Sequence, residues 1–225
     1  MIPIKPSDST RRRYIRNIVK VYNQATPDQK RRGAEWYRAA NQLATMISDG
    51  NTRAGAGVIA ALSANKAWDI NQRIARRAFE TGKPTGHVRD ALTKAARIMS
   101  GEDPEDVLPM AMKTGNFFRC IADPDDQEAV VIDRHAHDVA VGRPWGDDDR
   151  GLSSKGRYAV LSLAYRNAAA KLGVTPSVLQ ATVWVVWTEH LAGVARRPVL
   201  ERYKHAETDG PDAAIRLEQF LYPSE

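Results

Sequence analysis

The sequence has few of the residues that build disulfide-stapled or metal-bound proteins. Of its 225 residues only Cys120 is a cysteine, which excludes an internal disulfide and any four-cysteine zinc or iron–sulfur site. Cys120 follows Phe117-Phe118 in an apolar stretch, so we expect a buried thiol that serves packing. The sequence also lacks a Gly-rich phosphate loop, a Gly-x-Ser-x-Gly elbow and a Cys/His nucleophile pair.

Long apolar runs are missing as well. No stretch approaches the roughly 18 apolar residues that a membrane span needs, and the first residues, Met1-Ile-Pro-Ile-Lys-Pro6, contain no secretory apolar segment. We therefore expect a cytoplasmic protein without a membrane partner, and we predict no cofactor. With 43% hydrophobic and 27% charged residues, the composition is that of a soluble domain. The oligomeric state stays open.

Positive charge is in excess and unevenly distributed. The chain has 33 Lys and Arg against 27 Asp and Glu, a formal net charge of +6. The first forty residues contain Arg11-Arg-Arg13, Arg16, Lys20, Lys30-Arg-Arg32 and Arg38, with the aromatic residues Tyr14, Trp36 and Tyr37 between them. Such a segment can neutralise the phosphates of DNA, but it is equally typical of solvated helices packed along an aromatic seam.

The apolar spacing is helical almost throughout, which predicts an all-α, single globular multi-helix domain of about ten helices. We expect helices near 9–24, 27–47, 54–79, 88–99, 104–108, 112–121, 133–141, 158–172 and 176–191, with weaker ones after Gly193. The one β-like run, 129–132, is too short for a sheet. Residues 1–50 are predicted to be basic helices on the core, 51–193 the core itself, and 194–225 a C-terminal tail.

Asp133 is the residue that we expect to carry chemistry. It follows the apolar run Ala129-Val-Val-Ile132 and opens a predicted helix, twenty residues after Lys113. Backbone amides and the helix dipole at a helix N-terminus favour a carboxylate anion. Asp133 is therefore predicted to act as a catalytic carboxylate, as the N-cap of its helix, or as both.

Three segments resemble motifs of the helix-hairpin-helix DNA glycosylase superfamily, the endonuclease III-like enzymes. Ile59-Ala-Ala-Leu-Ser-Ala-Asn-Lys-Ala-Trp-Asp69 is similar to a "LLSAQATD" motif, Leu108-Pro-Met-Ala-Met-Lys-Thr-Gly-Asn-Phe-Phe118 to "LPGVGRKTANVV", and Val130-Val-Ile-Asp-Arg-His-Ala136 to "IAVDTHI". The resemblance covers about residues 55–142. The chain departs from it at Met110-Ala-Met112, where the family has hairpin glycines and one more residue.

The resemblance implies an enzyme that flips a DNA base out of the stack and acts at its glycosidic bond or at the 5-substituent of a pyrimidine. It implies Asp133 as the essential carboxylate and Lys113 as a partly desolvated nucleophile at C1′, with a phosphate contact as the alternative for Lys113. It also implies that Asn65 belongs to a loop that intrudes into the stack. The predicted DNA- and substrate-binding residues are Asn65, Lys66, Trp68, Thr114, Asn116, Arg134, His135 and Gln180.

The chain also resembles a phage branch of this superfamily, the glutamyl/putrescinyl-thymine pyrophosphorylases. These are proposed to replace a pyrophosphate on 5-hydroxymethyluracil in DNA with an amine. In such a reaction Asp133 would serve as base for the amine, with Arg134 or His135 near the leaving phosphate. This relationship implies a phage-infected or bacterial host cell.

Other interpretations remain open. Asp133 and His137 share a helix face, but two ligands are too few for a metal site, so we predict no bound metal. The apolar helix around 178–190 is expected to be a core helix from which Gln180 reaches a pocket. The alternative function is a non-catalytic DNA-binding or protein-interaction module on the same scaffold.

Overall fold

The computed structural model describes the backbone of residues 1–206 and the side chains of residues 1–191. These residues form ten α-helices and no strand, which confirms the all-α prediction. Met1–Val186 make one compact unit and Trp187–Glu225 a second, and the last helix, α10 (Pro176–Ala206), begins in the first unit. Among the described residues, no helix is long and apolar enough to cross a membrane.

Within the first unit, six helices form a group centred on α3. They are α2 (Pro27–Ile47), α3 (Thr52–Leu62), α4 (Trp68–Thr81), α5 (Arg89–Met99), α6 (Pro104–Val107) and α7 (Lys113–Ala122), and α3 contacts each of the others. Every residue of α3 from Gly55 to Leu62 is buried. A Cβ on Gly55 would lie 2.1 Å from the Ala44 carbonyl oxygen, so glycine is required where α2 crosses α3.

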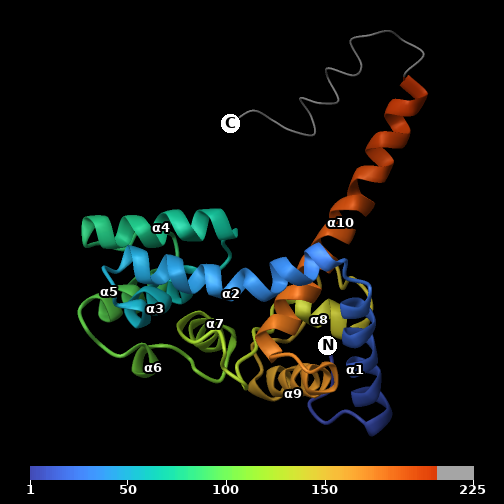
Figure 1. The fold of residues 1–225 in the computed structure, drawn as a ribbon, viewed down its shortest axis with the longest axis horizontal. Helices are drawn as coiled ribbons and strands as arrows, with labels where there is room; N and C mark the ends of the chain where they lie inside the picture. The colour runs from blue at the N-terminus through green and yellow to red at the C-terminus, as the bar shows by residue number, and fades with distance from the viewer. Residues whose placement is uncertain (207–225) are drawn as a thin grey trace. The chain divides into compact units, whose positions relative to one another are not determined.

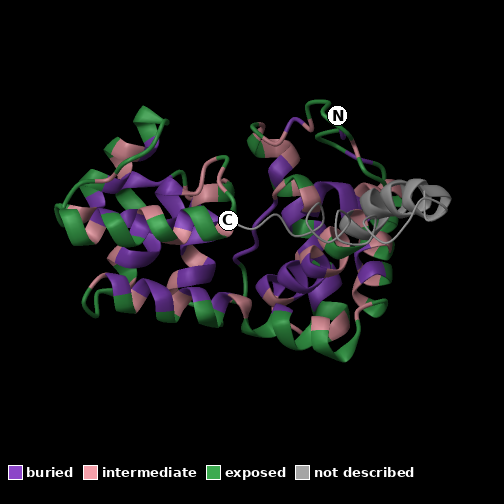
Figure 2. Ribbon diagram, turned by 90° about the horizontal axis from the view of Figure 1, so that it is seen from above, coloured by how far each residue is buried: buried purple, intermediate pink, exposed green. Residues whose placement is uncertain are grey.

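A second group contains α1 (Asp8–Asn23), α8 (Arg134–Val141) and α9 (Lys155–Leu172), and α1 packs on both α8 and α9. The buried residues of α1 are Tyr14, Ile18 and Val21, which lie on one face because they are spaced by four and three positions. Figure 1 shows α2 running past both groups. Buried residues gather where the helices of each group face one another (Figure 2).

Several helix ends lie where capping residues predict them. Thr26 forms a capping box with Gln29 at the start of α2, Asp103 caps α6, and α8 ends at Gly142 with φ 84°. Side-chain oxygens satisfy amides that a helix start leaves without partners, and glycine adopts the left-handed conformation of a helix end. The caps therefore explain why these boundaries are readable in the sequence.

Two predicted boundaries are wrong. The segment expected as one helix over 54–79 is two helices, α3 and α4, separated by a turn in which Asn65 has φ 55°. The helix expected to end at 191 continues as α10 to Ala206. The remainder of the predicted C-terminal tail, residues 207–225, lies outside the described residues.

Candidate functional site

The turn between α6 and α7 is closed without glycines inside it. Within the turn, the Met112 amide donates to the Pro109 carbonyl over 2.9 Å. From α7, Asn116 Nδ2 donates to the carbonyls of Met110 (3.3 Å) and Met112 (3.0 Å). A Cβ on Gly115 would lie 2.2 Å from Met110 Cα, so the turn lies directly on α7 at this glycine.

Asn116 therefore has a structural role in place of the predicted contact with substrate. Its side chain is buried, and besides closing the turn its Oδ1 accepts the Val130 amide at 3.4 Å. This bond joins α7 to the extended segment that leads to Asp133.

Lys113 is the first residue of α7 and is exposed, while the neighbouring Thr114 is half-buried. Lys113 is therefore accessible to solvent. Phe117 lies one helical turn further along the same face of α7, and its ring lies 6.3 Å from that of Trp68. Lys113 is thus one helical turn away from the aromatic pair Phe117 and Trp68.

Asp133 is the N-cap of α8, as the sequence predicts. Its Oδ1 accepts the Ala136 amide at 2.8 Å, and the residue is half-buried. No described residue donates a hydrogen bond to the other carboxylate oxygen. The cap therefore uses one carboxylate oxygen, and the second accepts no hydrogen bond from the described residues.

Two tyrosines of α9 hold the backbone on either side of Asp133. The Tyr158 hydroxyl accepts the Ile132 amide and donates to the Val130 carbonyl, both at 3.0 Å, and the Tyr165 hydroxyl donates to the Ala136 carbonyl at 3.0 Å. Burial raises the pKa of both tyrosines, and the negative charge of Asp133 raises it further. The Asp133 charge is therefore close to two buried, protonated hydroxyls.

His135 connects this segment to the first turns of α10. Its ring lies 6.3 Å from that of Trp184 in an edge-to-face arrangement, and its Nε2 accepts a hydrogen bond from Nε of the exposed Arg134 at 3.1 Å. Burial lowers the pKa of His135, although Asp133 opposes this shift. The imidazole is accordingly neutral at pH 7, with its proton on Nδ1, which has no hydrogen-bond partner among the described residues.

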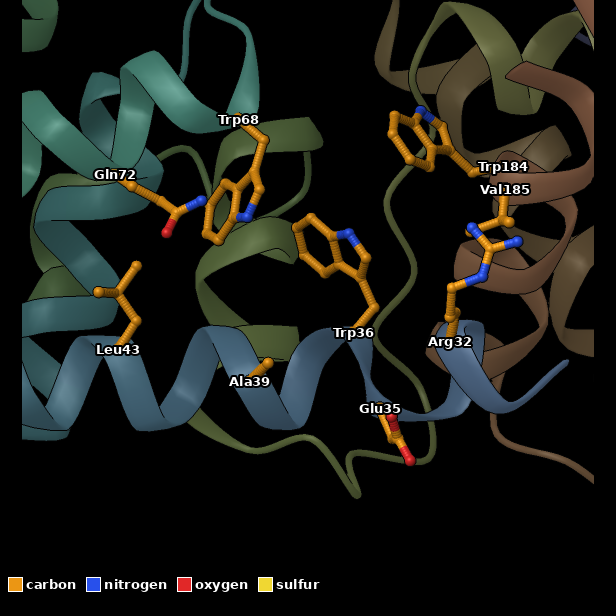
Figure 3. Close-up of a pocket in the computed structure, with 9 residues that line it drawn as sticks. All are labelled: Arg32, Glu35, Trp36, Ala39, Leu43, Trp68, Gln72, Trp184 and Val185. Carbon is orange, nitrogen blue, oxygen red and sulfur yellow. The ribbon is translucent and has the colours of Figure 1, made fainter. Parts of the chain in front are cut away.

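An aromatic cleft of about 380 Å³ opens beside Trp184. Figure 3 shows its three indoles, Trp36 of α2, Trp68 of α4 and Trp184 of α10, directed towards the same opening. The Trp36 and Trp68 rings are 4.9 Å apart at a tilt of 43°. The other lining residues are Arg32, Glu35, Ala39, Leu43, Gln72 and Val185. A cleft of this size and composition suits a flat, largely apolar ligand with polar edges.

The structure places the other predicted residues as follows. Asn65 and Lys66 lie in the turn just before Trp68, and Asn65 is exposed. Gln180 does not reach the cleft: it is buried, and its Oε1 accepts the Tyr37 hydroxyl at 2.9 Å. Gln72 was not predicted as a site residue, and Trp184 was predicted to be a core residue, with stacking on an extruded base as the alternative. The one sequence feature that pointed to this site was the group of polar residues that interrupts the helical spacing before Trp68.

The remaining candidates for a metal site form a structural network. Asp138 accepts two bonds from Arg150, at 2.8 Å each, and one of its oxygens lies 2.9 Å from Nδ1 of the fully buried His137. Burial lowers the pKa of His137, which outweighs the opposite influence of Asp138. Within the described residues, no three His, Cys, Asp or Glu side chains are grouped to hold a metal ion. Cys120 is buried, as expected.

These features define the class of protein: an all-helical domain with an aromatic cleft and a carboxylate that caps α8. The chain belongs to a protein family described as "Family of unknown function (DUF7178)", whose model matches residues 1–191. The match covers the whole first unit, and so includes the cleft and Asp133. No curated protein and no solved structure matches the chain.

Proposed function

We propose that this protein acts on a base of DNA, which it draws out of the stack into the aromatic cleft and excises or modifies near Asp133. The observation that carries the proposal is the arrangement of three indoles around one cleft. His135, two residues after Asp133 in the sequence, packs against one of these indoles, that of Trp184. Enzymes that act on a base must first expose it, and aromatic side chains stabilise an extruded base by stacking.

In this proposal Asp133 supplies the negative charge. Its second carboxylate oxygen would stabilise positive charge on the sugar as the glycosidic bond weakens, or accept a proton from an attacking amine. The capping bond to Ala136 and the two tyrosines support such a role because they hold the carboxylate in one position before the ligand arrives.

Lys113 has two possible roles at such a site. As a nucleophile its amine would form a bond to C1′ while the bond from C1′ to the base breaks and the base takes up a proton. As a phosphate contact it would only orient the DNA, and its exposed position at the start of α7 favours this second role. We therefore expect no adduct when the protein is treated with borohydride on abasic DNA. A trapped adduct that is lost in Lys113→Ala would assign the nucleophilic role instead.

The cleft can be tested through binding alone. Trp184→Ala and Trp68→Ala should each weaken binding to DNA with a destacked base about 5- to 150-fold, since stacking on an aromatic side chain contributes roughly 1–3 kcal/mol per base. Met46→Ala, which changes an exposed apolar residue outside the cleft, is the control. Circular dichroism checks that each variant is folded. Wild-type affinity in both tryptophan variants would exclude the cleft as the base-binding site.

A further inference from the structure

The outer face of α1 carries positive charge that forms no ion pair with other described residues. Arg12, Arg16 and Lys20 are exposed and spaced four residues apart, so they form one stripe along the helix. This stripe lies on the opposite side of α1 from its buried face. The only acidic residue of α1 is Asp8, in its first turn, where it lies near Arg11.

Other helices of the same chain pair their cations internally. Arg31 lies near Glu35 on α2, Arg73 near Asp69 on α4, and Lys94 near Asp90 on α5, each with a spacing of four residues. On α1 the same spacing joins like charges, which destabilise a helix. Within the described residues, the ion pairs include none made by the stripe. The sequence alone did not separate α1 from α2, because both are rich in arginine.

We propose that the stripe Arg12, Arg16 and Lys20 binds the phosphodiester backbone of DNA, outside the cleft. A helix rises about 1.5 Å per residue, so the three cations span about 12 Å, a length over which one strand of a duplex presents several phosphates. The inference rests on the proposed function in one respect: the polyanion is the DNA whose base enters the cleft.

The geometry favours nucleic acid over a membrane surface. A helix that lies on a membrane inserts its apolar face among the lipids, but the apolar face of α1, with Tyr14 and Ile18, is buried against α8 and α9. The fully exposed residues of α1 are all polar or charged, and its remaining apolar residues Ile15 and Val19 are half-buried. A regular row of cations with no fully exposed apolar residue on the same helix is suited to a regular row of phosphates.

The test compares two triple variants with the same change in charge. R12Q/R16Q/K20Q removes the stripe, and R73Q/K94Q/R97Q removes three cations that form internal ion pairs. Binding of duplex DNA to the full chain is measured from about 50 to 300 mM salt. The stripe variant should reduce the slope of log affinity against log salt by about 2 to 3, because each phosphate contact contributes about 0.9. The control variant should retain a slope close to that of the wild type.

Each other outcome overturns the inference. A stripe variant with the wild-type slope would show that α1 does not contact phosphates, and it would leave the role of the cleft untouched. No DNA binding by the wild-type protein, or stripe-dependent binding to phosphatidylserine vesicles but not to DNA, would overturn both this inference and the proposed function. If the stripe variant has a reduced salt slope but the wild-type protein leaves the bases of the DNA unchanged, the stripe binds phosphates and the proposed enzymatic function is contradicted.

Discussion

At the scale of single residues, the position of Asp133 depends on hydroxyl groups supplied by α9. Tyr158→Phe removes the partner of both the Ile132 amide and the Val130 carbonyl in a buried environment. Leaving buried backbone groups without partners costs about 1–3 kcal/mol, so we expect a loss of that size in the free energy of unfolding, measured with urea. Tyr22→Phe, at a half-buried tyrosine, should change it little. Equal stabilities of the two variants would contradict the role of Tyr158.

The buried histidines make stability depend on pH. Burial lowers the pKa of His135 and His137 from 6.5 in the folded protein, so the unfolded chain takes up protons first as the pH falls. The stability that comes from keeping these histidines neutral is complete above about pH 6.5. It falls as the pH drops from there to the lowered pKa of each histidine, by at most about 1.4 kcal/mol per pH unit for each one. Urea unfolding between pH 7.5 and 5.5 measures this slope.

Two histidine variants test which residue causes this pH dependence of the free energy of unfolding. His137→Gln should reduce the pH dependence, whatever its effect on stability at pH 7.5, whereas His87→Gln, at an exposed histidine, should leave the wild-type slope. Asp138 does not contribute in this range: burial opposes its ionisation, yet bonds from Arg150 and His137 hold its pKa below the usual value. A slope that His137→Gln leaves unchanged would assign the effect elsewhere.

At the scale of elements, the turn between α6 and α7 depends on one glycine. Gly115→Ala would bring a Cβ to 2.2 Å from Met110 Cα and 2.7 Å from the Pro109 carbonyl oxygen, and backbone atoms cannot move aside as a flexible side chain can. We expect a loss of about 1–3 kcal/mol in the free energy of unfolding. Lys113→Ala, exposed in the same helix, is the control. A Gly115→Ala variant as stable as this control would mean that the turn is not pressed against α7.

Most helices could be predicted because their ends carry local signals. Thr26-Pro27, Asp103-Pro104 and Gly142 are cap residues whose preference follows from backbone hydrogen bonding. The helical spacing did not reveal the break between α3 and α4 because the break contains neither glycine nor proline, although the family resemblance implied a loop at Asn65. Asn65 was the signal there, since asparagine tolerates a positive φ better than most residues.

At the scale of the whole molecule, the candidate site could be predicted only in part. Asp133 was identifiable from an apolar run followed by a helix cap. The cleft was not, because Trp36, Trp68 and Trp184 belong to helices far apart in the sequence. Helical periodicity indicates which side of a helix is apolar but not which other helix faces it, and a half-buried tryptophan has the same pattern as a core residue.

Mass spectrometry of treated DNA tests most directly whether base chemistry occurs beside Asp133. DNA containing natural and 5-substituted pyrimidines is incubated with the wild-type protein or with Asp133→Asn, with and without added amines, and the released bases and digested nucleosides are analysed by mass spectrometry. Both proteins are first checked for equal DNA affinity. We expect a released or altered base with the wild-type protein and none with Asp133→Asn. An unchanged nucleoside profile with wild-type protein that binds the DNA, or the same product from both proteins, would contradict it.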